Sequence, residues 1–181
     1  NIAEKSSVAS DKPSSKRAHP AEMRISRTIA SKIEEFSSVP QFIYDRVKLG
    51  YAPQFQRHVN KTVQTVIAEA SKHHFDPMFI MAIIQTESNF NPLVRGTHGE
   101  IGLMQIKPDT AEWIAKKFGY QWKGAKSLED PSENIKIGAA YFAFLRSSFQ
   151  KNSKNYITAY NLGPAKLRRA IKENVEIAEY R

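Results

Sequence analysis

Glu87 is the residue of this chain best suited to acid–base chemistry. It follows an apolar segment, Met78–Ile84, and Phe90 comes three residues after it. On a helix these side chains would surround the carboxyl, and the negative end of the helix dipole would disfavour its ionised form. Both effects predict a raised pKa, which a general acid needs near neutral pH. The segment alone is equally compatible with an ordinary surface glutamate at a frayed helix end.

The helix that would carry Glu87 has clear start and stop signals. Asp76 is a good N-cap, and Pro77 suits the first helical position because no N–H partner is needed there. Pro92 biases Asn91 away from helical backbone, so the helix should end at or before that residue. Because residues 78–84 are apolar on every side, most of this helix should be buried.

Two later segments offer polar groups near glycines. A loop with Gly96, Gly99 and Gly102 can fold back tightly, and its Gln105 has both a donor and an acceptor for a sugar amide or hydroxyl. The alternative is a structural turn whose apolar residues fill the core. Tyr160 and Asn161 precede a glycine stop, where they could bond a ligand or a catalytic acid; core packing and helix capping explain them as well.

The remaining pattern predicts a mainly α-helical chain. Helices are expected at about residues 25–38, 40–50, 53–73, 108–118, 131–149, 156–163 and 165–176. The second of these helices has Phe42, Ile43 and Val47 as apolar residues, and Trp113 is expected to pack inward. Tyr120 and Trp122 could stack on a sugar ring or pack in the core.

Composition indicates a globular protein with an excess of positive charge. Of the 181 residues 41% are hydrophobic and 25% charged, and the formal net charge is +9. That charge favours polyanions, but no nucleic-acid-binding signature is present, so we expect no nucleic-acid partner. No apolar run approaches the roughly 18 residues of a membrane span, and there is no cysteine. His73-His74 completes no zinc-ligand spacing, so no metal or other cofactor is expected.

Four short motifs follow one another at suitable spacing. They are Glu87-Ser88; Gly102-Leu103-Met104-Gln105-Ile106 with Pro108; Asn134-Ile135 with Gly138 and Tyr141; and Ala159-Tyr160-Asn161 with Gly163. Together they resemble the catalytic domain of the soluble lytic transglycosylases, which cleave peptidoglycan and are related to goose-type lysozymes. The resemblance runs from about residue 60 to about 172, and it implies a lysozyme-like, mainly helical fold. We therefore expect a flexible arm at 1–20, an N-terminal helical layer at 21–59 and the catalytic domain at 60–181.

The resemblance also implies a reaction and a set of site residues. Glu87 matches the family's single catalytic acid, which protonates the bond between N-acetylmuramic acid and N-acetylglucosamine and then acts as base. The muramyl 6-hydroxyl closes on the anomeric carbon and gives a 1,6-anhydro end without water or metal. The positions that match substrate-binding or neighbouring residues are Ser88, Gly102, Leu103, Met104, Gln105, Tyr141, Tyr160 and Asn161.

Two positions depart from the family pattern. Glu100 stands where the family often has a small residue, and Gly96 where it often has serine. As a second carboxylate, Glu100 could hold a water molecule and make the enzyme a lysozyme-type hydrolase. It could instead pair with a cationic, N-deacetylated sugar, or simply face solvent.

We interpret the chain as a monomeric enzyme, secreted or periplasmic, whose partner is the peptidoglycan glycan strand. The chain starts at Asn1 without methionine, which is compatible with a mature or trimmed form. A noncatalytic module that only binds the cell wall is the alternative of a different class.

Overall fold

The computed structural model describes residues 38–175. The chain divides into two compact units, Asn1–Ser38 and Val39–Arg181. The expected flexible arm and the helix expected at about 25–38 therefore lie outside the described residues, apart from Ser38. Within residues 39–175 the structure is helical, and isolated β-bridges take the place of strands.

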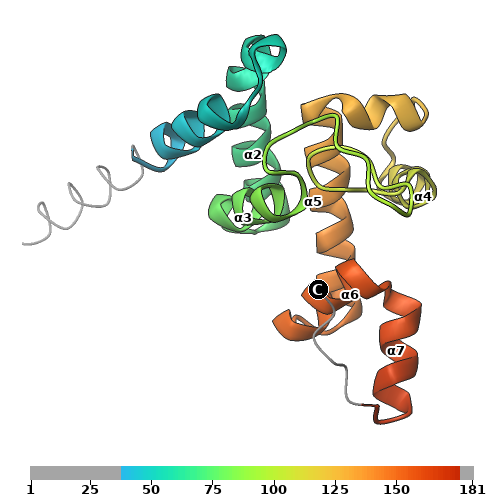
Figure 1. The fold of residues 1–181 in the computed structure, drawn as a ribbon. Coiled ribbons are helices and arrows are strands. Elements are labelled where there is room, and N and C mark those ends of the chain that lie inside the picture. Colours follow the sequence, from blue (N-terminus) through green and yellow to red (C-terminus); the bar gives the residue numbers. More distant parts are fainter. Residues whose placement is uncertain (1–37, 176–181) are drawn as a thin grey trace, which may run out of the picture. The chain divides into compact units, whose positions relative to one another are not determined.

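A first helical segment is described at residues 38–50, and the other elements follow it along the chain (Figure 1). The loop at residues 89–107 between α3 and α4 is the longest connection among them. They are η1 (Pro53–His58), α2 (Val59–His73), α3 (Pro77–Ser88), α4 (Pro108–Phe118), η2 (Ala125–Glu129), α5 (Pro131–Ser148), α6 (Ser153–Leu162) and α7 (Pro164–Lys172). The mainly α fold expected from the sequence is confirmed. None of the helices in this part of the chain is long and apolar enough to span a membrane.

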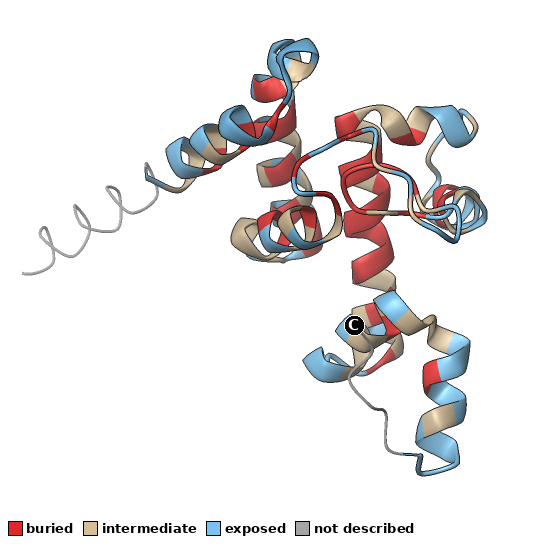
Figure 2. Cartoon of the chain, in the orientation of Figure 1, coloured by how far each residue is buried: buried red, intermediate tan, exposed pale blue. Residues whose placement is uncertain are grey.

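Helix α5 lies at the centre of this arrangement. Helices α2, α4 and α6 pack against it, and Figure 2 shows it buried along most of its length. It begins as the sequence predicts, because the Asp130 side chain accepts hydrogen bonds from the N–H groups of Ser132 and Glu133. Gly138 lets another segment approach closely: a Cβ there would lie 2.4 Å from the sulfur of Met104. The helix thus supports the loop that contains Met104.

Helix α3 also has the predicted ends. The Asp76 carboxylate accepts a hydrogen bond from the Met78 N–H, and Pro77 occupies the first turn. The helix ends at Ser88, and Asn89 caps it in the left-handed conformation with φ of 48°. Ile80, Met81 and Ile84 are buried, so the apolar segment forms part of the core as expected.

Two expectations about helices need correction. The segment expected as one helix from about 53 to 73 consists of two elements. It begins with the 3-10 helix η1, and the α-helix α2 starts at Val59. Trp113 is 43% exposed and does not pack inward, since Ala111, Ile114 and Ala115 form the buried side of α4.

Candidate active site

The carboxyl of Glu87 lies in the last turn of α3, half-buried. No hydrogen bond or ion pair from another residue between 38 and 175 reaches it. Burial raises its pKa, and the negative charge of Glu100 raises it further. Next to it, the Ser88 hydroxyl is buried and donates to the Ile84 carbonyl at 3.0 Å, so it serves its own helix. A carboxyl without fixed donors, with a raised pKa, can give up a proton and take it back.

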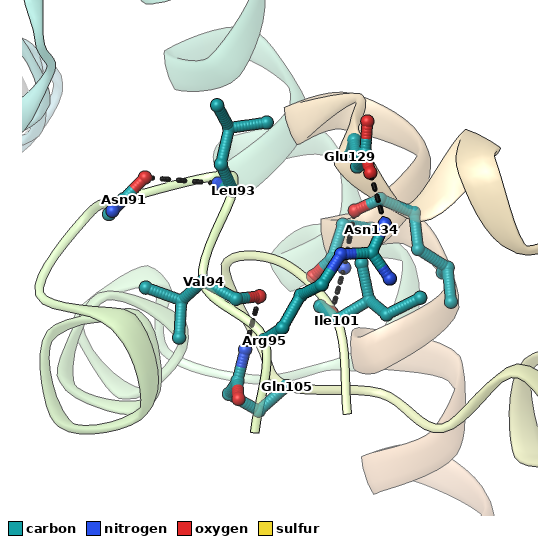
Figure 3. A network of polar contacts seen from close by, with 9 residues as sticks. Asn91, Leu93, Val94, Arg95, Ile101, Gln105, Glu129 and Asn134 are labelled. Atoms are coloured by element: carbon teal, nitrogen blue, oxygen red, sulfur yellow. Dashed lines mark hydrogen bonds and ion pairs between the residues drawn. The ribbon is translucent and has the colours of Figure 1, made fainter. Parts of the chain in front are cut away.

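The loop between α3 and α4 is held in place by one buried amide, Asn134 of α5. Its Nδ2 donates to the carbonyls of Ile101 (2.8 Å) and Leu128 (2.9 Å), and its Oδ1 accepts the Met104 N–H at 2.8 Å. Figure 3 shows the bond to Ile101 among the polar contacts of this loop. Gly102 makes room for the amide: its φ is +82°, and a Cβ there would lie 2.3 Å from Asn134 Nδ2. The position of the loop is therefore fixed from the core side.

Gln105 presents an acceptor to the site. Its Nε2 donates to the carbonyls of Val94 (3.1 Å) and Gly102 (2.8 Å), and the first of these bonds is drawn in Figure 3. Since both amide hydrogens are used within the loop, Oε1 is the atom left for a ligand. The sequence predicted that Gln105 offers a ligand both a donor and an acceptor. In the structure only the acceptor, Oε1, is free of a bond within the loop.

Glu100 lies in the same loop, and its charge is held by its surroundings. Burial alone would raise its pKa, but the backbone N–H groups of residues 100 and 98 and the Lys107 ammonium hold the pKa below its usual value. The His98 N–H donates to Oε2 at 3.0 Å, and Lys107 Nζ lies 3.4 Å from Oε1. The carboxylate occupies space left by Gly96, where a Cβ would lie 2.3 Å from Oε2. The two departures from the family pattern are therefore in contact.

The aromatic wall of the site comes from α5 and α6. Tyr160 stacks on Phe142 with ring centroids 4.0 Å apart and 12° between the planes, and its hydroxyl donates to the Met104 carbonyl. Burial raises the pKa of Tyr160 well above its usual value, and the charges of Glu87 and Tyr141 add to this shift. Burial also raises the pKa of Tyr141. Both phenols are therefore neutral hydrogen-bonding groups, and Tyr160 lies close enough to Glu87 for the carboxylate charge to act on it.

A groove of about 210 Å³ brings many of these groups together. Its lining includes five positions expected from the sequence, namely Glu100, Gln105, Tyr141, Tyr160 and Asn161. Glu87 does not line the groove itself, but it interacts electrostatically with two residues that do. Its charge raises the pKa of Tyr160, and the charge of Glu100 raises the pKa of Glu87.

Other expected site residues do not line the groove. The side chains of Leu103 and Met104 are fully buried, Ser88 is bonded within its helix, and Gly102 lies against Asn134. These residues shape the loop from behind. Tyr120 and Trp122 are partly buried and pack against the core, outside the groove lining.

Sequence reasoning did not single out Lys107 and Thr110, which line the groove, and it placed Asn134 in the third motif without giving it a role. In the structure Asn134 holds the loop. A buried asparagine on an otherwise apolar helix face was the signal available for Asn134, because such an amide needs several partners. For the other two, which lie at the start of α4, the sequence carries no distinctive signal.

Within the described residues, no three His, Asp or Glu side chains are grouped so that they could hold a metal ion. His73 instead lies 3.4 Å from the Glu69 carboxylate, where burial lowers the pKa of the imidazole.

The family model described as "Transglycosylase SLT domain" matches residues 64–180, which is most of the chain. The chain belongs to this family. The SLT match includes α3, the loop held by Asn134 and the groove-lining helices. The resemblance inferred from the four sequence motifs is thereby confirmed.

Known relatives agree with the SLT assignment. The chain is 32% identical over 150 residues to the soluble lytic murein transglycosylase of Escherichia coli (strain K12). This match covers 81% of this chain and 20% of that protein. It is 30% identical to the membrane-bound lytic murein transglycosylase C of Serratia proteamaculans, covering 81% of this chain and 43% of that protein. The chain thus spans less than half the length of these two relatives.

A solved structure supports the same fold. The structure of an inactive Glu-to-Gln mutant of the lytic transglycosylase Slt from Pseudomonas aeruginosa matches with a TM-score of 0.58 and 29% identity. The match covers 71% of this chain and 24% of that one. It confirms the expected lysozyme-like helical fold of this SLT domain.

Proposed function

We propose that this SLT domain cleaves the glycan strands of peptidoglycan between N-acetylmuramic acid and N-acetylglucosamine, leaving 1,6-anhydromuramic ends. Family membership supports the reaction class. The observation that carries the assignment of Glu87 is its half-buried carboxyl. Its pKa is raised, it accepts no hydrogen bond within residues 38–175, and its charge acts on Tyr160 of the groove lining.

The reaction can be written with Glu87 as the single proton carrier. Its carboxyl donates a proton to the glycosidic oxygen while the bond from that oxygen to the muramyl anomeric carbon breaks. The resulting carboxylate then accepts the proton of the muramyl 6-hydroxyl as O6 bonds to the same carbon. Atoms and charges balance, and the acid is regenerated without water.

The other groups have positioning roles in this proposal. Gln105 Oε1 accepts a hydrogen bond from a sugar N–H or O–H. The exposed amide of Asn161, on α6, contacts the glycan strand from another part of the groove lining. Tyr160, bonded to the Met104 carbonyl, fixes the distance between α6 and the loop. The substrate implies a secreted or periplasmic location, and the chain is expected to act as a monomer.

Mass spectrometry of the products from purified peptidoglycan tests the proposal. Anhydro-ended fragments, one water lighter than hydrolysed fragments, are the expected result, and they should be absent with Glu87→Gln. Cleavage that survives this substitution would remove Glu87 from the mechanism. Binding to the wall without released fragments, from acetylated and deacetylated walls alike, would favour the noncatalytic alternative.

A hydrolytic reaction is the second candidate, and one observation favours it. Glu100 lines the groove and is held ionised by backbone N–H groups and Lys107, as a base that activates water would be. Hydrolysis predicts reducing muramic ends in the same experiment. It also predicts that Glu100→Gln abolishes their formation, whereas the transglycosylase reaction needs no second carboxylate.

A further inference from the structure

The end of α3, where Glu87 lies, is contacted by a segment outside the family match. The first helical segment is described at residues 38–50, whereas the family model begins at residue 64. From Val39 onward this segment belongs to the same compact unit as α3. Its Arg46 contacts the last turn of α3, and its Gly50 contacts the turn that follows. The helix that carries Glu87 is therefore held from outside the matched region.

A polar relay connects Arg46 to the C-cap of α3. Arg46 Nη2 donates to Gln85 Oε1, and Gln85 Nε2 donates to Asn89 Oδ1. Asn89 caps α3 in the left-handed conformation, and its N–H donates to the Gln85 carbonyl at 3.1 Å. Because successive helical residues are rotated by about 100°, Gln85 and Asn89 share one side of α3 and Glu87 lies on the opposite side. The relay thus holds the helix end from behind the acid.

A packing contact holds the turn after the cap. Phe90 is buried and has φ of 61°, a left-handed conformation that bulky residues seldom adopt. Gly50 leaves the space for it, since a Cβ there would lie 2.5 Å from the Phe90 Cβ. The Arg46 guanidinium lies 5.8 Å from the centre of the same ring. The chain thus reverses directly after the catalytic helix through two left-handed residues, and the first helical segment supports this strained reversal.

We propose that Arg46 is a positioning residue for the acid. It acts through Gln85 on the last turn of α3, and Gly50 assists through Phe90. This inference rests on the proposed function, in which Glu87 transfers the proton. Since the Glu87 carboxyl accepts no hydrogen bond within residues 38–175, the backbone at the helix end decides where the proton is delivered. Helix ends fray, and a misplacement of about 1 Å can cost about 10²-fold in rate.

The contacts of Arg46 separate its role from substrate binding. Gln105 and Asn161 line the groove, but Arg46 and Gly50 are not among its lining residues. Loss of the relay should therefore slow the chemical step and leave strand binding nearly unchanged, so the effect falls on kcat and not on KM. A residue that served only the stability of the fold would not separate the two constants in this way.

Steady-state cleavage of soluble glycan strands by the full chain tests the proposal. Arg46→Gln should lower kcat by roughly tenfold and leave KM within about twofold. Arg46→Lys should recover part of kcat, because its ammonium still donates to Gln85. The matched control is Lys48→Gln, which removes an exposed cation from the same helical segment and should change neither constant. As a second variant, Gly50→Ala should also lower kcat, because its methyl group displaces Phe90.

Hydrogen exchange gives a readout that does not depend on activity. The Asn89 N–H is bonded to the Gln85 carbonyl, and in Arg46→Gln it should exchange roughly tenfold faster than in the unsubstituted chain. Amides in the middle of α5 should keep their rates. Lys48→Gln should leave both groups of amides unchanged.

Four results would overturn the positioning role. An unchanged kcat in Arg46→Gln is the first, and an equal fall in Lys48→Gln, which would indicate a general effect of charge, is the second. The third is a raised KM at constant kcat, which would indicate a direct contact with the strand. The fourth is faster exchange throughout the chain, which would indicate a loss of global stability. Failure of the proposed function looks different, because the unsubstituted chain would then release no fragments while the exchange comparison still measures the support of α3.

Discussion

Two carboxyls of the site, Glu87 at the end of α3 and Glu100 in the loop at residues 94–106, have opposite surroundings. Glu100 lines the groove, and Glu87 interacts with residues of its lining. In the part of the chain that the structure describes, no donor reaches the Glu87 carboxyl, and burial raises its pKa. Glu100 has backbone N–H donors and Lys107, which hold its pKa below the usual value. The surroundings of the two carboxyls therefore shift their pKa values in opposite directions. The shift of Glu87 is the one that suits a general acid, and the shift of Glu100 favours a fixed negative charge.

The two regions also differ in how they are held. The end of α3 is a regular helix whose Ser88 hydroxyl and Asn89 cap satisfy the helix itself. The loop has no regular structure and depends on Asn134, on Gln105 and on two isolated bridges of Ile101. Substitutions should therefore affect chemistry at the first region and stability at the second.

The largest expected effect is on activity at the end of α3. Glu87→Gln should lower the rate of peptidoglycan cleavage by roughly 10²–10⁴-fold, because the amide cannot transfer the proton. The rate of release of soluble fragments measures this, with Glu112→Gln as control for an exposed acid on α4. If Glu100→Gln reduced the rate as much, the contrast between the two carboxyls would be lost.

The largest expected effect on stability lies behind the loop. Asn134→Leu should lower the free energy of unfolding by about 3 kcal/mol, because the Met104 N–H and two carbonyls lose their partner in the core. Urea denaturation measures the change. Asn152→Ala, which removes only a helix cap at α6, should cost about 1 kcal/mol. A loss at Asn134 no larger than at Asn152 would mean that the loop is held by other contacts.

The contact between Gly96 and Glu100 predicts a coupled pair. Gly96→Ser should destabilise the chain by about 1 kcal/mol, because its Cβ would push the end of the Glu100 side chain away from the His98 N–H. In a chain that already has Glu100→Ala, the same substitution should cost less. Thermal unfolding of the two single variants and the double variant measures this coupling. Additive losses would show that the carboxylate moves away freely.

A smaller effect is expected on the pH dependence of cleavage. The charge of Glu100 raises the pKa of Glu87, so Glu100→Gln should lower it. Less of the acid form would then be present at neutral pH, and the alkaline limb of the profile of kcat/KM should move to lower pH. Lys107→Gln, which keeps the carboxylate, serves as a comparison. If the alkaline limb stays in place in Glu100→Gln, the charge of Glu100 does not raise the pKa of Glu87.

Much of this architecture could be predicted from the sequence because its signals are local. The capping acids Asp76 and Asp130, each followed by proline, mark the starts of α3 and α5, and the glycine at 119 marks the end of α4. The family motifs then indicated the carboxyl of Glu87. All of these signals depend on neighbouring residues alone, so no tertiary contact had to be known.

What could not be predicted depends on contacts between distant segments. The roles of Asn134 and of the contact between Gly96 and Glu100 come from the way the loop folds back on α5. The error at Trp113 has a similar origin. A periodic helix has more apolar positions than one buried face needs, and only the packing of α4 on α5 decides which of them stays outside.

The smallest expected effect compares the two carboxyls through the stability of the fold. The pKa of Glu87 is raised in the folded state, so its stabilising contribution is full below the unfolded-state pKa and is lost as pH rises through the folded-state value. The pKa of Glu100 is lowered, so its contribution is present at neutral pH and is lost as pH falls.

At pH 7, Glu87→Gln should therefore raise Tm by about 2–4 °C, and the gain should shrink as the pH falls through the range in which carboxyls protonate. Glu100→Gln should lower Tm by a similar or smaller amount at pH 7, because its partner Lys107 is half exposed, and that loss should also shrink in acid. Calorimetry of both variants from pH 7 to pH 4 measures the two trends. If both substitutions shifted Tm in the same direction at pH 7, the two carboxyls would have the same kind of surroundings. The contrast between Glu87 on α3 and Glu100 in the loop would then be wrong.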